Sequence, residues 1–336
     1  MTIAPERQRI AADHVIYTFD PEHEPIADAS APASLTIEAR DAYDRGCVEL
    51  DIQTYLAHRK PGQMNPATGP IAITNATPGD TLHVTIEAIR VGPRGYVATT
   101  HGTGLLGHQT VPETIFPFDV DGSEVLMAGG ARLPLRPMVG TIGVAPNKGS
   151  IETLSLGRHG GNLDFNDITI GTTIHLPVRA ERAMFAIGDV HATMGDGEAH
   201  SGVNIDAEID LRLSITHAAP LEWPWFETNT EVMTIGIADE LTEALRIAQA
   251  SMESLLGQRL DVSPTEARSL AGAAVDLRLG QAFHRDREEL RRFRERLCRC
   301  DEGDPDGRSD GRRHQTRAAV EPRAVRIRPR SGEREC

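Results

Sequence analysis

A succession of short β-prone segments through the first 235 residues constrains the fold of this chain more than any other feature. The segments are rich in Val, Ile and Thr, and clusters of Gly, Pro, Asn and Asp separate them, as is typical of strands and turns. Residues 82–90 and 205–213 alternate apolar and polar side chains, which indicates strands with one solvated face. This spacing favours a sandwich or barrel over a parallel sheet with crossover helices. The predicted strands are residues 14–19, 35–39, 71–74, 81–91, 140–144, 173–177, 183–187 and 205–215.

Two helices are predicted after the last of these strands. Residues 238–256 carry apolar side chains at helical spacing, and we expect Gly257 to end this amphipathic helix. Ser263, Pro264 and Glu266 predict the start of a second helix, in which Ser263 is the N-cap of a capping box and Pro264 occupies the first helical position.

The chain is expected to be mostly β, with three regions. Residues 1–235 form a mainly β scaffold, resembling a sandwich or jelly roll, that carries the functional site, and residues 236–283 form a smaller, largely helical α+β annex. Residues 284–336 hold sixteen Arg and no Lys, and lack the apolar periodicity of a folded segment. This composition resembles a GC-rich gene read out of frame, so a frameshift near residue 284 is one hypothesis. A basic tail that binds an acidic partner is the other, and resequencing the gene distinguishes them.

Net charge narrows the classes of partner. The chain carries −14 at pH 7 and residues 284–336 alone carry +4, so the remaining residues carry −18. A body this acidic repels nucleic acid and anionic membranes, and it suits small neutral substrates or cations. No apolar run approaches the roughly 20 residues that span a bilayer. Because the first residues lack a secretory signal and Cys47 is the one cysteine outside the tail, we expect a cytoplasmic protein without a disulfide framework.

The segment from Gly188 to Glu198 concentrates groups that bind metals or move protons. Asp189, His191, Asp196 and Glu198 fall within eleven residues, together with three glycines. In an extended strand Asp189 and His191 point to the same side, so a carboxylate oxygen and an imidazole nitrogen can bind one cation. The alternative is an ordinary Gly-Asp turn with solvated carboxylates and one half-buried histidine.

Three other segments share this acidic, histidine- and glycine-rich character. We expect their loops to converge with residues 188–198 at one end of the β scaffold, where sites commonly lie. Each one alone is better explained as a plain turn, because Asn and Asp next to Gly most often form turns. The polar or flexible residues that single them out are Asp41, His101 with Gly102 and Gly104, and Asn162 with Asp164.

Taken in order, several motifs resemble the acetamidase/formamidase family over residues 13–282. They are residues 65–70 (Asn-Pro-Ala-Thr-Gly-Pro), 78–80, 139–146, 160–164 and, most specifically, 188–198. The resemblance implies a mostly β fold, a bound divalent metal and hydrolysis of a short amide to ammonia and a carboxylate. It also implies a cytoplasmic homodimer. Met194 stands where the family commonly has Gln, and the β segment expected soon after residue 280 is not visible in the sequence.

Amide hydrolysis needs an activated water, a stabilised oxyanion and a proton for the leaving nitrogen. We expect Asp189 and His191 to bind a divalent metal, Zn²⁺ above all, with His101, Asp41 and Asp164 as companions. The remaining roles fall to six residues. Glu198 is the candidate general base with Asp164 as a second proton-transfer candidate, Asn162 holds the amide, N–H groups near Gly102 and Gly104 stabilise the oxyanion, and Asp196 with Glu198 could instead bind Ca²⁺.

Three alternatives stay open on the sequence alone. A nucleophilic amidase would need an activated Ser or Cys, but Cys47 lies between acids that raise a thiol pKa, and residues 1–283 contain no Gly-x-Ser-x-Gly motif. A non-catalytic β-sandwich module that binds calcium would hold metal without releasing ammonia from formamide. A family member with an altered C-terminus would be inactive until its reading frame is restored.

Overall fold

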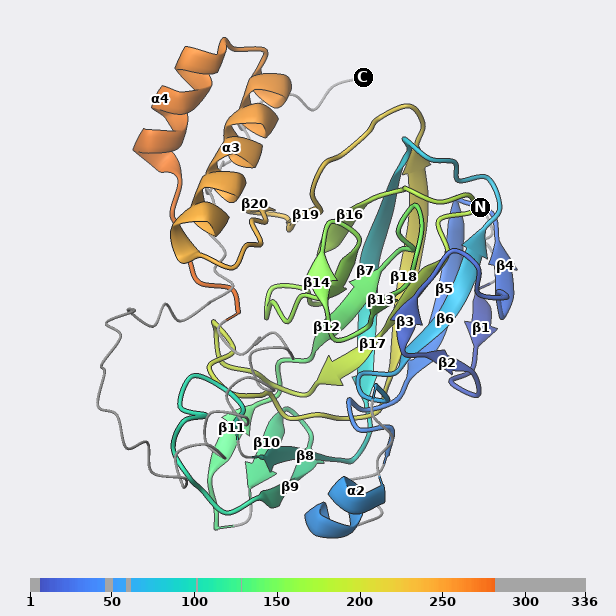
Figure 1. Ribbon diagram of the computed structural model, residues 1–336, viewed down its shortest axis with the longest axis vertical. Coiled ribbons are helices and arrows are strands. Elements are labelled where there is room, and N and C mark those ends of the chain that lie inside the picture. The colour runs from blue at the N-terminus through green and yellow to red at the C-terminus, as the bar shows by residue number, and fades with distance from the viewer. Residues whose placement is uncertain (1–6, 46–50, 59–61, 101, 128, 282–336) are drawn as a thin grey trace, which may run out of the picture.

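Two facing β-sheets of seven strands each form the framework of the protein (Figure 1). The computed structural model describes residues 7–45, 51–58, 62–100, 102–127 and 129–281. In that part of the chain the first sheet contains β1 (Gln8–Ile10), β5 (Ala33–Ala39), β7 (Thr81–Val91), β16 (Thr173–Pro177), β18 (Ala207–Thr216), β19 (Trp225–Glu227) and β20 (Val232–Thr234). Its strand order is β1-β5-β18-β7-β16-β19-β20. All of its pairings are antiparallel except that of β1 with β5.

The second sheet carries the motifs that the sequence singled out. It contains β2 (Val15–Ile16), β4 (Ala27–Ala29), β6 (Ala67–Ile73), β12 (Met138–Gly143), β14 (Leu156–Gly157), β15 (Gly160–Asn162) and β17 (Phe185–His191). The order is β14-β15-β12-β17-β6-β2, and β4 pairs in parallel with β6. Two smaller sheets complete the β structure: β3 (Thr18–Phe19) with β13 (Ile151–Glu152), and β8 (Arg94–Thr99), β9 (Thr114–Asp121), β10 (Glu124–Met127) and β11 (Arg132–Pro134).

The sheets enclose one hydrophobic core to which both contribute. Leu35 and Ile86 project from the first sheet and Ile71 and Ile142 from the second, and all four side chains are fully buried. The alternation of β7 places its apolar residues in this core and its polar ones on the outer face. The prediction of a mostly β, sandwich-like fold with a few helices towards the C-terminus is confirmed.

The strand predictions hold for the long elements and fail at several boundaries. The predicted strand 14–19 is split into two short strands, β2 and β3. The predicted strand 183–187 starts too early, because Arg182, Ala183 and Met184 have left-handed φ angles that turn the chain before β17. β17 then continues to His191 and so includes the predicted metal ligands. The sheet β8–β11 was not predicted, since β9 contains Pro117 and β11 is wholly exposed.

Three helices are described: α2 (Ile52–His58), α3 (Leu241–Leu260) and α4 (Pro264–Ala274). The predicted capping box is confirmed, with Ser263 accepting from the Glu266 N–H and the Glu266 carboxylate accepting from the Ser263 N–H. The prediction that Gly257 ends the first helix is wrong. α3 runs to Leu260, and Asp261 takes the left-handed C-cap conformation instead.

The α3–α4 hairpin lies beside β19 and β20, at the opposite end of the molecule from the β8–β11 sheet (Figure 1). Met252 and Leu256 of α3 pack with Ala267 and Ala271 of α4 and with Val232 of β20. None of the described helices has the length and apolarity needed to cross a membrane.

The tight reversal at residues 77–80 is closed by Asp80. Its carboxylate accepts hydrogen bonds from the Thr77 N–H at 2.9 Å and the Ala218 N–H at 3.0 Å, and it lies 2.9 Å from His217 Nδ1. Burial alone would raise the pKa of Asp80, but these hydrogen bonds outweigh it and lower the pKa to about 2.

Asp80→Asn is expected to lower the free energy of unfolding by ~1–3 kcal/mol at pH 7, because a charged acceptor of several hydrogen bonds is lost. The stabilisation by the carboxylate is complete above its ordinary pKa of 3.8 and disappears as pH falls towards 2. Urea unfolding of both proteins at pH 7, 4 and 3 checks this. A difference between the two proteins that stays constant down to pH 3 would contradict the assignment.

Candidate active site

A cluster of buried polar side chains lies where β12, β15 and β17 run side by side. Antiparallel pairing aligns β12 with β17 on one side and with β15 on the other. The side chains that meet here are almost wholly shielded from solvent. They are Asn65, Thr141, Asn162, Asp164, Asp189, His191, Glu198 and Gln281.

A switch of strand faces puts Asp189 and His191 into this cluster. Ile187 and Val190 both belong to the hydrophobic core although they are three residues apart in a strand, where alternate residues share a face. The switch occurs at Asp189, whose φ of +55° is left-handed. Asp189 and His191 therefore flank Val190 on the face away from the apolar core, and they point the same way, as the sequence predicted.

Asp164, Asp189 and His191 form a group that could hold a metal ion. His191 Nε2 lies 3.2 Å from Asp164 Oδ1 and 3.6 Å from Asp189 Oδ1, and one ligand atom from each residue lies within 4.8 Å of the others. Among the described residues, Asp189 Oδ1 and His191 Nδ1 are buried without a hydrogen-bond partner. Two carboxylates and an imidazole are a zinc-type donor set. Because unsatisfied buried polar atoms are costly, these residues fit a bound cation.

The charge balance of the cluster also favours a bound cation. Burial raises the pKa of Asp189 to about 7; the neighbouring His191 lowers it and Asp164 raises it further. Burial lowers the pKa of His191, but the charge of Asp189 and the contact with Asp164 outweigh burial and raise it. The cluster holds three buried carboxyl groups, with Glu198 as the third, and one imidazole. Such an excess of buried negative charge calls for protons or for a cation.

Glu198 faces Asp164 across the side chain of Gln281. Gln281 Nε2 donates to Glu198 Oε2 and to Asp164 Oδ2, each at 2.8 Å. Burial, followed by the charge of Asp164, raises the pKa of Glu198 well above its ordinary value. A buried carboxyl group with a raised pKa can exchange a proton with a substrate.

Asn65 and Thr141 orient the cluster from the other side. Asn65 Nδ2 donates to Asp189 Oδ2 at 2.6 Å and to Asn162 Oδ1 at 2.7 Å, and Thr141 Oγ1 donates to Asn162 Oδ1 at 2.8 Å. Sequence reasoning did not assign roles to Asn65, Thr141 or Gln281. The first two lie inside quoted family motifs, which is the signal that could have found them, whereas Gln281 is a single Gln with no local pattern around it.

Several cluster residues have left-handed backbone angles. Asn65, Asp164, Asp189 and Glu198 have φ of +51°, +49°, +55° and +30°. Non-glycine residues in this region cost on the order of 1–3 kcal/mol each, and such strain is concentrated at functional sites. The fold therefore sacrifices backbone stability to bring these four side chains together.

Gly140 of β12 makes room for the two aspartates. A Cβ atom at this position would lie 2.4 Å from Asp164 Oδ1 and 2.8 Å from Asp189 Oδ2.

Gly140→Ala is expected to push the two carboxylates apart and to lower metal affinity or activity by ~10–100-fold. Metal analysis and amide turnover measure this, with Gly272→Ala on α4, where a Cβ meets nothing within 4 Å, as the matched control. Equal metal content and turnover in both variants would contradict it.

Some predicted site residues lie outside the cluster. Asp41 is buried nearby and accepts hydrogen bonds from the Tyr96 hydroxyl and from backbone N–H groups, and burial raises its pKa to about 6. Its charge acts on Asp189, but Asp41 is not part of the metal-ligand group. Asp196 forms an ion pair with Arg278, and its side chain is 45% exposed. His101 lies outside the described residues.

The loop with Gly102 and Gly104 lies against the residue that follows Glu198. The Leu105 N–H donates to the Ala199 carbonyl at 2.8 Å, and a Cβ at Gly104 would lie 2.7 Å from the same oxygen. Both glycines have positive φ angles. The loop thus borders the Glu198 side of the cluster, and Gly104 can approach it only because it lacks a side chain.

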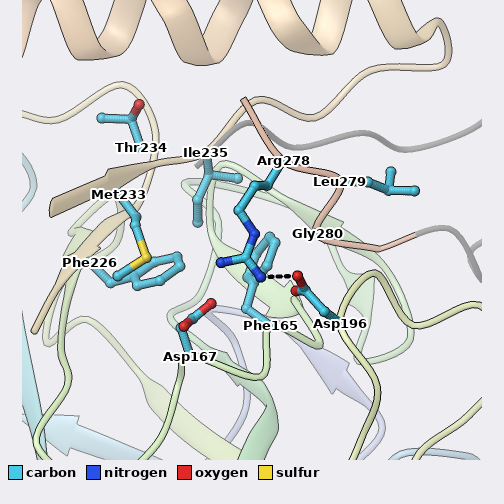
Figure 2. Close-up of a pocket in the computed structure, with 10 residues that line it drawn as sticks. All are labelled: Phe165, Asp167, Asp196, Phe226, Met233, Thr234, Ile235, Arg278, Leu279 and Gly280. Atoms are coloured by element: carbon cyan, nitrogen blue, oxygen red, sulfur yellow. Dashed lines mark hydrogen bonds and ion pairs between the residues drawn. The ribbon is translucent and has the colours of Figure 1, made fainter. Parts of the chain in front are cut away.

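A hollow opens next to the cluster (Figure 2). The hollow is small and open to solvent, and Arg278 and Asp196 pair across it. Phe165 follows Asp164, and Gly280 precedes Gln281, so the backbone that lines the hollow also carries cluster residues. The other lining residues are Asp167, Phe226, Met233, Thr234, Ile235 and Leu279.

The fold and the cluster define a β-rich protein with a buried acid–imidazole centre. A sequence model of the acetamidase/formamidase family matches residues 5–154 and 148–233. The chain belongs to the acetamidase/formamidase family, as the motifs predicted.

Relatives and solved structures agree with this assignment. The chain is 31% identical over 135 residues to an acetamidase of Mycolicibacterium smegmatis, covering 34% of this chain and 33% of that protein. It is 26% identical over 207 residues to a putative formamidase of Schizosaccharomyces pombe, and this match covers 44% of this chain and 50% of that protein. The matches thus span a third to a half of the length of these two relatives.

Solved structures match a larger part of the chain. The crystal structure of a Bacillus halodurans acetamidase is 35% identical in sequence, with a TM-score of 0.77 over 82% of this chain and 93% of that one. The crystal structure of a predicted acetamidase/formamidase from Thermoanaerobacter tengcongensis is 32% identical in sequence. Its TM-score is 0.77 over 82% of this chain and 92% of that one.

Proposed function

We propose that this protein hydrolyses a short aliphatic amide, formamide or acetamide, to a carboxylate and ammonia with the help of a divalent metal ion. The observation that carries the proposal is the buried Asp164–Asp189–His191 group with its unpartnered Asp189 oxygen. Family membership supports amides as the substrate class. The acidic body of the chain suits a small uncharged substrate and a cation.

Asp164, Asp189 and His191 would hold the cation, for which zinc fits the donor set better than calcium. When bound, such an ion supplies Lewis acidity and lowers the pKa of water to about 7. Calcium through Asp196 is disfavoured because that carboxylate is paired with Arg278. Asn65 holds the Asp189 carboxylate in place by its hydrogen bond to Oδ2.

Glu198 is the residue that moves protons in this proposal. It takes the proton from the attacking water and delivers it to the leaving nitrogen, as a buried carboxyl with a raised pKa can do near neutral pH. Asn162 would orient the amide, since its side chain is fixed by Asn65 and Thr141. Backbone N–H groups of the loop at Gly102 and Gly104 would stabilise the oxyanion.

Met194 bears on the range of amides accepted. Its Cβ and the His191 ring both lie within 3 Å of the position that a Cβ of Gly202 would take, so Met194 borders the metal group. A thioether cannot hydrogen-bond an amide as the Gln side chain common in the family can.

For the assembly and the location, our prediction is a homodimer in the cytoplasm. Sedimentation would test the oligomeric state and cell fractionation the location.

The decisive experiment measures ammonia release from formamide, acetamide and longer amides, with and without chelator, alongside elemental analysis of the protein. We expect release that chelator abolishes and zinc restores. Metal binding without ammonia release would indicate a binding module or an inactive family member. Chelator-insensitive release would indicate a nucleophilic amidase; Cys47, the candidate nucleophile, lies outside the described residues.

A further inference from the structure

Gln281 is a buried polar residue at the end of a largely exposed segment. After α4 the chain returns towards the β scaffold, and Asp276, Leu277 and Leu279 on the way are exposed. Gly280 and Gln281 are buried, and Gln281 forms a parallel β-bridge with Gly197. The segment thus inserts its end into the cluster and leaves the rest in solvent.

The Gln281 side chain donates to two neighbouring carboxyl groups, those of Asp164 and Glu198, which also contact each other. Its Nε2 group lies 2.8 Å from both Asp164 Oδ2 and Glu198 Oε2, and 3.3 Å from the Asn162 carbonyl. One NH₂ group has two hydrogens, so the two carboxylates take its full capacity and the carbonyl is a weaker third acceptor. Gln281 Oε1 is buried without a hydrogen-bond partner among the described residues.

This arrangement is poor for stability and good for holding two acids. An unsatisfied buried oxygen lowers stability, so an apolar residue would serve packing better. An amide donates to both carboxylates without adding charge, whereas Lys or Arg would pair with them and neutralise them. Without this donor, only a shared proton would hold the two carboxyl groups together, and they would repel each other whenever both are ionised.

We propose that Gln281 is a positioning residue: its side-chain amide holds the Glu198 carboxylate facing Asp164 in the geometry that the reaction needs. The proposal rests on the amide hydrolysis proposed above. The helical annex then contributes to catalysis through its return segment, and the site is complete only when residues far apart in the chain, Asn162 and Gln281 among them, meet.

The test replaces Gln281 by Met, which keeps the length and removes both donors, and by Glu, which keeps the shape and adds a third acid. Gln258→Met on the exposed face of α3 is the matched control. At saturating metal, Gln281→Met is expected to lower kcat by ~10–100-fold, as loss of a supporting hydrogen bond does, with KM within about twofold of wild type. Gln281→Glu is expected to lose at least as much.

Crystal structures of wild type and Gln281→Met provide a readout that does not depend on activity. We expect the Glu198 and Asp164 carboxylates to turn away from each other in the variant. Wild-type kcat in Gln281→Met overturns the positioning role, as does a fall in kcat matched by Gln258→Met. A wild type that hydrolyses no amide overturns the proposed function instead. In that case, carboxylates that keep their places in the variant also overturn the role of Gln281.

Discussion

Asp189→Asn is expected to lose bound metal and amide turnover together. Asn keeps the shape of the side chain and can still accept the hydrogen bond from Asn65, but it removes the negative charge and the anionic oxygen that is left unpartnered. A Lewis acid contributes several kcal/mol to such a reaction, so turnover should fall on the order of 10³-fold or more. His191→Ala should give the same result through loss of the imidazole.

Elemental analysis and ammonia release measure this effect, with Asp119→Asn as the matched control. Asp119 is exposed and pairs with Arg94 on the β8–β9 hairpin, outside the cluster. Thermal unfolding of each variant shows that the fold is intact. If Asp189→Asn retains full metal and full activity, the ligand assignment is wrong.

Glu198→Gln is expected to keep the metal and lose the rate. The substitution preserves the volume beside Gln281 but cannot take up or deliver a proton. General acid–base catalysis contributes typically ~10²–10⁴-fold, and kcat should fall by that factor while KM changes little. Steady-state kinetics with parallel metal analysis separate the two effects.

The exposed Glu124→Gln, which breaks only a surface pair with Arg132, serves as the control for Glu198→Gln. A normal rate in Glu198→Gln would remove this residue from the mechanism. Loss of metal together with rate would make it a ligand rather than a base.

Much of the site could be predicted from sequence because its residues sit in short, dense motifs. Asp189, His191 and Glu198 come from one motif and Asn162 and Asp164 from another, and all five meet in the structure. Composition within a few residues was enough to single them out.

Other members of the cluster carry no such local mark. Asn65 lies 124 residues from the Asp189 carboxylate that it holds, and Gln281 lies 117 residues from Asp164. Conversely, Asp196 belongs to the strongest motif but pairs with Arg278 instead. Spacing along the chain does not say which of two neighbouring acids points inward.

The sequence by itself determined the local features: the β character of the body, the alternation of the long strands and the capping box at Ser263. These depend on side chains a few residues apart, where backbone preferences and short hydrogen bonds decide. Only the tertiary structure decided which strands became neighbours, where β17 changes face and which acids became buried together. Those outcomes depend on strand order and on the left-handed turn at Asp189, because a contact between residues a hundred positions apart exists only once both sheets have formed.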